Sequence, residues 1–363
     1  MTAARTWLIN RTDAIGDTVL TLVVAELIKK KSPQDKVIFL VSQRVQDLME
    51  SAPFVDEVWC LDRSQSVLSQ YVQLTRNFKG RKIDHYLYVG GSHLPSWFAF
   101  MKRVKWRGGI VSRWPSFLFL NRGLRQRRSS ASPFHESHYN LTLLEEFYPY
   151  WQKDYDPRLS QLCFDIGSTS ESRLYKQTFA SMTKPWPNYI IIHPGMTGHT
   201  LNWPMNMYAQ LIKKILEQNL HIHICLSMTP SDFSYIEELK SYWKSLNLST
   251  AFNERLHFID GSTNGLIDYM QMLKGARLFL GPSTGTTHLA NLLRVPTFGI
   301  YSPVPVQSKE RWAPLIRNEE TVLFSPDVQC PEIKSCAGES CPYYDCMQNI
   351  TIERVYSEME PYL

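Results

Sequence analysis

The sequence has no apolar run that approaches the ~18 residues needed to span a membrane. Near its start, Thr6 to Asn10 form a short apolar stretch that is soon followed by charge, which predicts a strand and not a signal peptide. Neither sign of charge dominates, because the net charge of the 363 residues is only +5. We therefore expect a globular, cytoplasmic protein whose partners do not include nucleic acid.

Closely paired cysteines are also missing. Four of the seven cysteines gather near the end of the chain, with five, four and four residues between them: Cys330, Cys336, Cys341 and Cys346. Structural zinc sites usually contain cysteines two to four residues apart. We therefore expect reduced thiols here, and no bound metal or other cofactor.

The common nucleotide-binding fingerprints do not occur at the first strand-to-helix junction. Arg11 to Thr18 contains neither a GxGxxG pattern nor the Gly-Lys-Thr of a P-loop. It contains two carboxylates instead, Asp13 and Asp17, and Asp17 stands where the first helix is expected to begin. An aspartate at that place is either a helix N-cap or a base, and both roles require the ionised form.

What the chain does have is a regular alternation of strand and helix patterns in its first half. The strands are expected at Trp7–Asn10, Val37–Val41, Val55–Leu61 and Tyr86–Val89, and Cys163–Phe164 is expected to close the sheet. The helices are expected at Asp17–Lys30, Arg44–Met49, Gln65–Asn77 and His138–Phe147. This rhythm is typical of βαβ units around a parallel sheet.

A second alternation follows a cluster of helix-breaking residues, Lys184 to Pro187. Strands are expected at Tyr189–Ile192, His221–Leu226, His257–Ile259, Leu278–Leu280 and Thr297–Ile300. Helices are expected at Met205–Gln218, Ser231–Leu246, Gly265–Leu273 and Thr286–Leu293. The pattern predicts two doubly wound α/β domains, residues 1–183 and 184–363, with a ligand-binding cleft between them.

The ten residues from Gly281 to Ala290 are the most informative of the second half. An apolar strand leads into them, a helix leads out, and small hydroxyl residues lie between. Unpaired N–H groups at a helix start favour an anion, and small side chains let a phosphate approach the backbone. The alternative is a well-capped turn without a ligand.

A basic, aromatic segment interrupts the first alternation. Lys102 to Arg128 contains nine basic residues and no acid, together with Trp106, Trp114, Phe117 and Phe119. Such a segment suits an anionic lipid surface or a phosphorylated substrate, although a solvated loop is the simpler alternative.

Several motifs, in order along nearly the whole chain, together resemble glycosyltransferase family 9, the lipopolysaccharide heptosyltransferases. They are Arg11–Asp17, Arg107–Gly109, His135–Glu136 with Tyr139–Leu141, Ile191–Gly195 with Asn202–Pro204, Gly281–Ala290 with Val295–Pro296, and Cys346–Met347 with Ile350–Thr351 and Val355. The resemblance implies a GT-B fold: two Rossmann-like domains facing a central cleft. The first domain would bind the acceptor and the second the nucleotide sugar, and the last helix can pack back on the first domain.

The same resemblance implies an inverting, metal-independent transfer of heptose from a nucleotide diphosphate sugar, most simply ADP-heptose, to a lipopolysaccharide core glycolipid. The family's general base falls on Asp17. Its diphosphate-binding residues fall on Ser283, Thr284, Gly285, Thr286, Thr287 and His288, with Thr197 as a further phosphate contact. The acceptor candidates are Asp13, Gly91, Ser92, His93 and Arg107.

A reaction without a metal needs other groups to meet the charge of the leaving diphosphate. Arg11 is the candidate cation, and an ion pair within its own domain is the alternative. The chain departs from the family pattern at Ser283, where an aspartate is frequent, and at Leu201, where a lysine is frequent. His199 would replace the missing charge if protonated.

These departures leave other functions open. One is a GT-B transferase that uses another nucleotide sugar and a protein or glycan acceptor. Another is a GT-B protein that binds a glycolipid without catalysis, and a third is a sugar-nucleotide epimerase. In the leading interpretation the basic segment holds the enzyme on the anionic inner face of the inner membrane.

Overall fold

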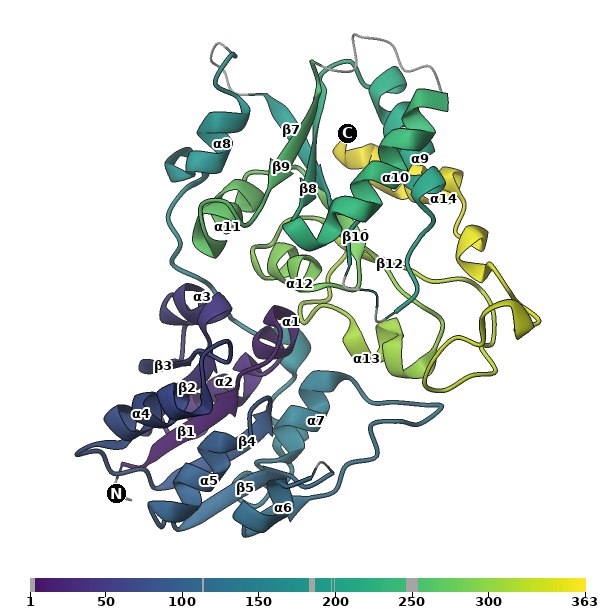
Figure 1. Ribbon diagram of the computed structural model, residues 1–363. Helices are drawn as coiled ribbons and strands as arrows, with labels where there is room; N and C mark the ends of the chain where they lie inside the picture. The colour runs from purple at the N-terminus through teal and green to yellow at the C-terminus, as the bar shows by residue number, and fades with distance from the viewer. Residues whose placement is uncertain (1–3, 113, 183–186, 197, 199, 246–253) are drawn as a thin grey trace. The chain divides into compact units, whose positions relative to one another are not determined.

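The computed structural model describes residues 4–112, 114–182, 187–196, 198, 200–245 and 254–363 (Figure 1). Residue contacts divide the chain into two compact units, and each unit contains its own parallel six-stranded sheet. Unit 1 consists of Met1–Arg128 and Glu136–Asp165, and unit 2 of Ser129–His135 and Ile166–Leu363. The predicted α/β class with two doubly wound sheets is therefore confirmed.

The sheet of unit 1 has the strand order β3-β2-β1-β4-β5-β6. Its strands are β1 (Thr6–Arg11), β2 (Lys36–Ser42), β3 (Glu57–Leu61), β4 (His85–Gly90), β5 (Trp106–Ile110) and β6 (Arg122–Leu124). Its helices are α1 (Ile15–Val19), α2 (Leu22–Lys31), α3 (Gln46–Glu50), α4 (Val67–Phe78), α5 (Leu94–Met101), α6 (Ser116–Phe119) and α7 (Glu136–Thr142). The first strand lies in the middle of the sheet, as in other doubly wound folds.

Alternating side chains of the strands build the core of unit 1. Leu8, Leu40 and Tyr88 lie in one buried cluster with Leu74 of α4 and Phe98 of α5. Trp7 contacts other aromatic rings, including that of Phe147 at a centroid distance of 4.8 Å. From Trp7 to Arg11 the β1 segment is thus buried, which fixes the position of the loop that follows it.

Two expectations for unit 1 are wrong in detail. Cys163–Phe164 forms no strand, and the sheet ends instead at β6, which lies inside the basic segment. The helix expected at Asp17–Lys30 is divided into α1 and α2, with Leu20 and Thr21 between them. The apolar periodicity is continuous across this break, so it gave no sign of a short first helix.

The sheet of unit 2 has the order β12-β11-β10-β7-β8-β9. Its strands are β7 (Asn188–Ile192), β8 (Ile222–Met228), β9 (Leu256–Asp260), β10 (Phe279–Pro282), β11 (Thr297–Ile300) and β12 (Thr321–Phe324). Its helices are α8 (Arg173–Thr178), α9 (Met205–Gln218), α10 (Phe233–Ser245), α11 (Leu266–Lys274), α12 (Gly285–Leu292), α13 (Lys309–Trp312) and α14 (Ile352–Met359). The sequence analysis found all of these strands except β12.

The last helix belongs to unit 2. Val355, Tyr356 and Met359 of α14 are buried in the same core cluster as Ile212 of α9. The Tyr356 hydroxyl also accepts a hydrogen bond from Asn219 at 3.1 Å. These contacts tie α14 to unit 2, and the expectation that the last helix also packs back on the N-terminal domain stays a prediction.

The segment before the expected boundary at 183/184 also belongs to unit 2, from Ile166 onward. Asp268 of α11 accepts hydrogen bonds from the backbone N–H groups of Arg173 and Leu174, at 2.6 and 2.9 Å. The ring of Phe179 lies 5.4 Å from that of Tyr189 on β7. These contacts tie α8 to unit 2, although α8 precedes the Pro-rich cluster at which the sequence predicted the domain boundary.

Candidate functional site

The loop after β1 and the loop after β4 meet at one edge of the unit 1 sheet. The chain leaves β1 toward β2 and leaves β4 toward β5, so the two connections diverge at neighbouring strands. Doubly wound sheets bind ligands at such switch points, outside the carboxyl ends of the strands. Asp13 and Asp17 follow β1 here, and Gly91, Ser92 and His93 follow β4.

Hydrogen bonds join the two loops. The Ser92 N–H donates to the Thr12 hydroxyl at 2.8 Å, and the Asn10 amide donates to the Ser92 carbonyl at 2.9 Å. The His93 ring lies beside that of Tyr88, with centroids 5.0 Å apart. The structure therefore brings the acceptor candidates of this edge together with Asp13.

Arg11 occupies the centre of this edge and is 97% buried, since only 3% of it is exposed. Its Nε lies 2.8 Å from Oδ1 of Asp13, and its Nη2 forms an ion pair with Asp17. Its Nη1 donates to the Val89 carbonyl at 3.0 Å. Arg11 was assigned to the donor diphosphate from the sequence, but in the structure it makes the ion pair within its own domain that was the alternative.

Asp17 does not cap its helix. The N-cap of α1 is Ala14, and no side chain caps the helix. Burial raises the pKa of the Asp17 carboxyl, and the negative charges of Asp13 and Glu136 add to this rise, which the Arg11 guanidinium only partly offsets. A carboxylate with a raised pKa is a stronger base than an ordinary aspartate, so the geometry favours the role of base over that of cap.

Arg107 lies elsewhere in unit 1. It stands at the amino end of β5, and its guanidinium donates to the backbone carbonyls of Phe119, at 2.7 Å, and Val104. The structure therefore does not bring Arg107 to the edge formed by Asp13 and Gly91. The sequence did not reveal that backbone carbonyls before β5 and at the end of α6 hold this side chain.

The sheet of unit 2 has its own switch point, between β7 and β10. The turn after β10 contains Ser283 and Thr284, and α12 begins at Gly285. Thr284 is the N-cap but makes no side-chain cap hydrogen bond, and its hydroxyl lies 2.8 Å from that of Thr286. The first N–H groups of α12 thus lack a side-chain cap at the carboxyl edge of the sheet, where an anion is favoured.

Hydrogen bonds to neighbouring residues hold other side chains of this turn in place. The Thr287 hydroxyl donates to the Pro282 carbonyl, and Ser283 hydrogen-bonds to the hydroxyl of buried Tyr301. Burial, together with the smaller effect of the nearby His135, lowers the pKa of His288 to about 3. His288 is therefore neutral near pH 7 and can offer a ligand an N–H group but no charge. Among the described residues, none forms a hydrogen bond with its Nδ1.

A buried polar chain beside this turn was not found from the sequence. Nδ1 of His193, which follows β7, lies 2.8 Å from the Ser227 hydroxyl, which lies 3.1 Å from that of Tyr269. Nε2 of His193 lies 4.0 Å from the Asp232 carboxylate. These contacts orient the loop after β7. Two residues expected in that loop, Thr197 and His199, lie outside the described residues.

Cys330, Cys336, Cys341 and Cys346 are free thiols. Within the described ranges, no three side chains of His, Cys, Asp or Glu are arranged to hold a metal ion. In the same part of the chain, no helix has the length and apolar character required to cross a membrane.

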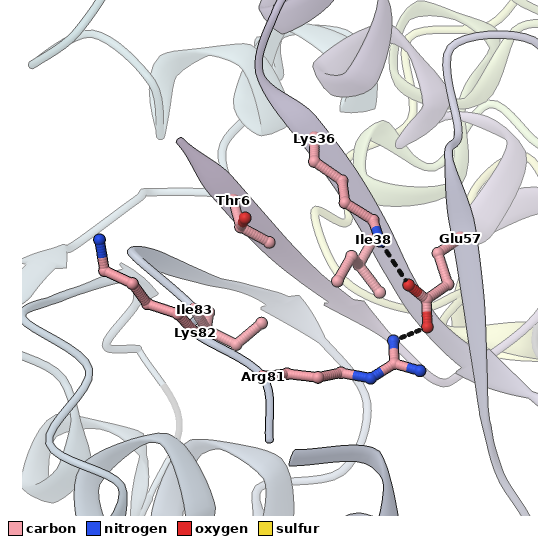
Figure 2. Close-up of a pocket in the computed structure, with 7 residues that line it drawn as sticks. All are labelled: Thr6, Lys36, Ile38, Glu57, Arg81, Lys82 and Ile83. Atoms are coloured by element: carbon pink, nitrogen blue, oxygen red, sulfur yellow. Dashed lines mark hydrogen bonds and ion pairs between the residues drawn. The ribbon is translucent and has the colours of Figure 1, made fainter. Parts of the chain in front are cut away.

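A hollow of about 390 Å³ lies at the opposite edge of the unit 1 sheet, at the amino ends of β1 to β3 (Figure 2). It is lined by Thr6, Lys36, Ile38, Glu57, Arg81, Lys82 and Ile83. Glu57 forms ion pairs with both Lys36 and Arg81 inside it. Because these charges already have partners and the switch point lies at the other edge, we do not assign a substrate to this hollow.

Comparison with known proteins adds to this geometry. The family described as Glycosyltransferase family 9 (heptosyltransferase) matches residues 72–339. A relative in Haemophilus influenzae, whose name goes no further than glycosyltransferase, is 25% identical over 322 residues, which cover 88% of both chains. Lipopolysaccharide heptosyltransferase 1 of Campylobacter coli is 22% identical over 311 residues, covering 82% of this chain and 84% of the relative.

A solved structure is similar over almost the full length. ADP-heptose lps heptosyltransferase II of E. coli superimposes with a TM-score of 0.75 and covers 99% of this chain and 98% of its own. The two sequences are 17% identical, so this likeness concerns the fold.

Proposed function

The chain belongs to glycosyltransferase family 9, the heptosyltransferases, and we propose that it transfers heptose from a nucleoside diphosphate donor to a lipopolysaccharide core glycolipid. It is a glycosyltransferase with a GT-B fold. The finer part of the proposal is an inverting reaction in which Asp17 is the base and no metal takes part. The observation that carries it is the pairing of Asp17 with buried Arg11 at the switch point of unit 1.

Inversion needs a single base that takes the proton of the acceptor hydroxyl as its oxygen attacks the anomeric carbon. Asp17 suits this role because its carboxylate is held by Arg11 and its pKa is raised by burial. Gly91, Ser92 and His93 lie at the same edge and are proposed to bind the acceptor, with Asp13 beside them. The acceptor hydroxyl would be held among these residues.

The donor is proposed to bind to unit 2 at the start of α12. The bond that breaks joins the anomeric carbon to the diphosphate, so the leaving group gains negative charge. Backbone N–H groups of Gly285 and Thr286, the Thr284 hydroxyl and the neutral His288 ring are the groups proposed to meet this charge. Ser283, the residue before Thr284, would belong to the same diphosphate site. Heptosyltransferase WaaC of E. coli has been solved with ADP, which supports an adenosine donor.

Replacing Asp17 tests the proposed base. Asp17→Asn is expected to lower the transfer rate from ADP-heptose to a lipid A core glycolipid by about 10²–10⁴-fold. The thermal stabilisation of the protein by ADP should remain, because the diphosphate is proposed to bind to unit 2. Asp47→Asn is the matched control, since Asp47 also lies in the first turn of a five-residue helix. Loss of ADP stabilisation together with activity would show that Asp17 is structural.

A second candidate function keeps the transferase and changes the donor. Leu201, where related sequences often have lysine, packs against the core of unit 2 and supplies no cation. A donor with another base or sugar is therefore the alternative. Thermal stabilisation by UDP or GDP, without any by ADP, would favour this alternative. Failure of every nucleotide sugar to be turned over would favour a glycolipid-binding protein instead.

We also propose that the enzyme acts at the cytoplasmic face of the inner membrane, which it contacts through an exposed basic surface of unit 1. Trp114 is 72% exposed, and Phe100, Met101, Phe117 and Leu118 are also exposed. Lys102, Arg103 and Lys105 are close to these apolar residues in the sequence, and they are exposed as well. Apolar side chains next to cations suit the interface of an anionic bilayer, where each cation adds about 1 kcal/mol.

Sedimentation with lipid vesicles tests the membrane contact. The protein is expected to bind vesicles rich in phosphatidylglycerol and not those of phosphatidylcholine alone, and salt should weaken the binding. A triple variant, Lys102→Gln, Arg103→Gln and Lys105→Gln, should lose most of it. The control is Lys213→Gln with Lys214→Gln, on α9 of unit 2. Equal binding by both variants would remove this surface from the proposal.

A further inference from the structure

Arg11 connects Asp17 to the backbone of the neighbouring strand. Each of its three guanidinium nitrogens faces a different oxygen: Asp13 Oδ1, the Val89 carbonyl of β4, and Asp17 Oδ1. The guanidinium donates hydrogen bonds to the Val89 carbonyl and to Asp17 and forms an ion pair with Asp13, so it cannot rotate without breaking one of these contacts. The direction in which the Asp17 carboxylate points is therefore tied to the sheet.

A second carboxylate approaches the same guanidinium from α7. Oε1 of Glu136, which is 99% buried, lies 4.0 Å from Nη2 of Arg11 and also forms an ion pair with Arg128. Arg128 is itself held by the side-chain oxygen of Gln126, at 2.9 Å from its Nε and 2.7 Å from its Nη2. A continuous chain of charges thus runs from Asp17 through Arg11 and Glu136 to Arg128.

The helix that carries Glu136 also holds the backbone around Asp17. The Asn140 amide of α7 donates to the Leu20 carbonyl at 3.1 Å and to the Thr21 hydroxyl at 3.3 Å. That hydroxyl donates in turn to the carbonyl of Asp17 at 2.8 Å. Two residues of α7, Glu136 and Asn140, therefore contact the segment that contains the base or the residues just after it.

Several charged side chains of the described residues surround Asp17. Arg11 faces it from β1, Asp13 from the following loop and Glu136 from α7, while Arg128 faces Glu136. Within the part of the chain that the structure describes, three carboxylates thus share two guanidinium groups. Carboxylates that compete for the same cation raise one another's affinity for a proton.

We propose that Arg11 and Glu136 are positioning residues for the base: Arg11 orients the Asp17 carboxylate, and Glu136, by sharing that guanidinium, sets how strongly Asp17 holds a proton. The proposal rests on the proposed function, in which Asp17 takes the acceptor proton. It gives Arg11 a role at the base in place of the donor phosphate. It also gives a role to Glu136, which the sequence analysis left without one.

The pH dependence of kcat separates this role from a merely structural one. Glu136→Gln removes one negative charge near Asp17, so the acidic limb of the profile is expected to move to lower pH, by about half a unit to one unit. Arg11→Gln removes the cation, so the limb should move to higher pH, by about one unit. Arg11→Lys keeps the charge and should restore most of that shift. General damage to the fold would not move the limb in opposite directions.

Three controls complete the experiment. Glu145→Gln changes an exposed carboxylate just after α7 and should leave the limb in place. Thermal unfolding identifies variants that do not fold. If Glu136→Gln is one of them, Arg128→Gln, which removes the guanidinium that pairs with Glu136, is measured in its place, with an upward shift expected. No shift, or shifts of the same sign for Glu136→Gln and Arg11→Gln, would overturn the proposal. A wild-type protein that transfers no sugar would instead overturn the proposed function.

Discussion

Gly91 is closely packed against the loop after β1 at the carboxyl edge of the unit 1 sheet. Its φ is +85°, and a Cβ atom there would lie 2.3 Å from the Thr12 hydroxyl and 2.7 Å from the Thr12 nitrogen. Thr12 accepts the hydrogen bond that joins the loops after β1 and β4. A side chain at residue 91 would therefore both strain the backbone and separate the two loops.

We expect Gly91→Ala to lower the free energy of unfolding by about 3 kcal/mol, because left-handed strain and overpacking add. Urea denaturation measures this loss. Gly80→Ala is the matched control, since Gly80 also has a positive φ, +71°, but no atom lies within 4 Å of the Cβ position. That variant should lose only about 1–2 kcal/mol. Equal losses of unfolding free energy in the two variants would mean that the structure relieves the contact with Thr12 at little cost in free energy.

At the scale of elements, Glu26 ties α2 to the last segment of unit 1. Its carboxylate accepts hydrogen bonds from the Tyr155 hydroxyl at 2.8 Å, the Ser160 hydroxyl at 2.6 Å and the Gln161 N–H at 3.2 Å, and it pairs with Lys30 at 2.9 Å. Burial alone would raise the pKa of this carboxyl, but these donors together lower it below its usual value. The ionised form is therefore the one that holds the segment to the helix.

We expect Glu26→Gln to lower the free energy of unfolding by about 1–3 kcal/mol near neutral pH. A lowered pKa in the folded state stabilises it above the pKa of the unfolded chain, about 4.3 for glutamate. That stability is lost as the pH falls through the lowered folded value, so the difference from wild type should shrink in acid. Urea denaturation at several pH values measures it. Glu217→Gln, which removes an exposed Lys–Glu pair on α9, should change little at any pH. A difference that grows in acid would contradict the assignment.

At the scale of the whole molecule, each unit contains a core of its own. Val355 of α14 is fully buried in the core of unit 2, although it lies only eight residues before the end of the chain. A cavity at this position should weaken the unit that holds it and leave the other unit unchanged.

We expect Val355→Ala to destabilise unit 2 by about 1–3 kcal/mol. Hydrogen exchange should become faster for the amides of β7 and β8 and stay unchanged for those of β1 and β2. Glu358→Ala, an exposed position on the same helix, serves as the control. Faster exchange in both sheets would mean that the units unfold together.

The same three scales separate what could be predicted from what could not. The helix Met205–Gln218 and the strand Thr297–Ile300 were predicted with the bounds that the structure has. Their patterns are local, since apolar residues recur at the helical period in one and run continuously in the other. The predicted turn after β10 likewise follows from small residues between an apolar strand and a helix.

Other features depend on contacts that no local pattern contains. The edge strand β6 lies in a basic segment without strand-like alternation, and it forms because β5 offers it a partner. The short helix α1 ends at Val19 because α7 holds Leu20 and Thr21 in place. Arg107 was grouped with the acceptor residues, yet its side chain donates to the carbonyls of Val104, just before β5, and Phe119, at the end of α6.

Local order along the backbone was therefore readable from the amino acids alone: the alternation of strands and helices, the acidic loop after β1, and the turn before α12. The partners of the charges were not. From the sequence, Arg11 could equally have bound a phosphate. Only the folded arrangement of β1, β4 and α7 shows that its partners are Asp13, Asp17 and Glu136. The physical reason is that periodicity and turn chemistry act over a few residues, whereas a buried charge is satisfied by whichever opposite charge the folded chain places within a few ångströms of it.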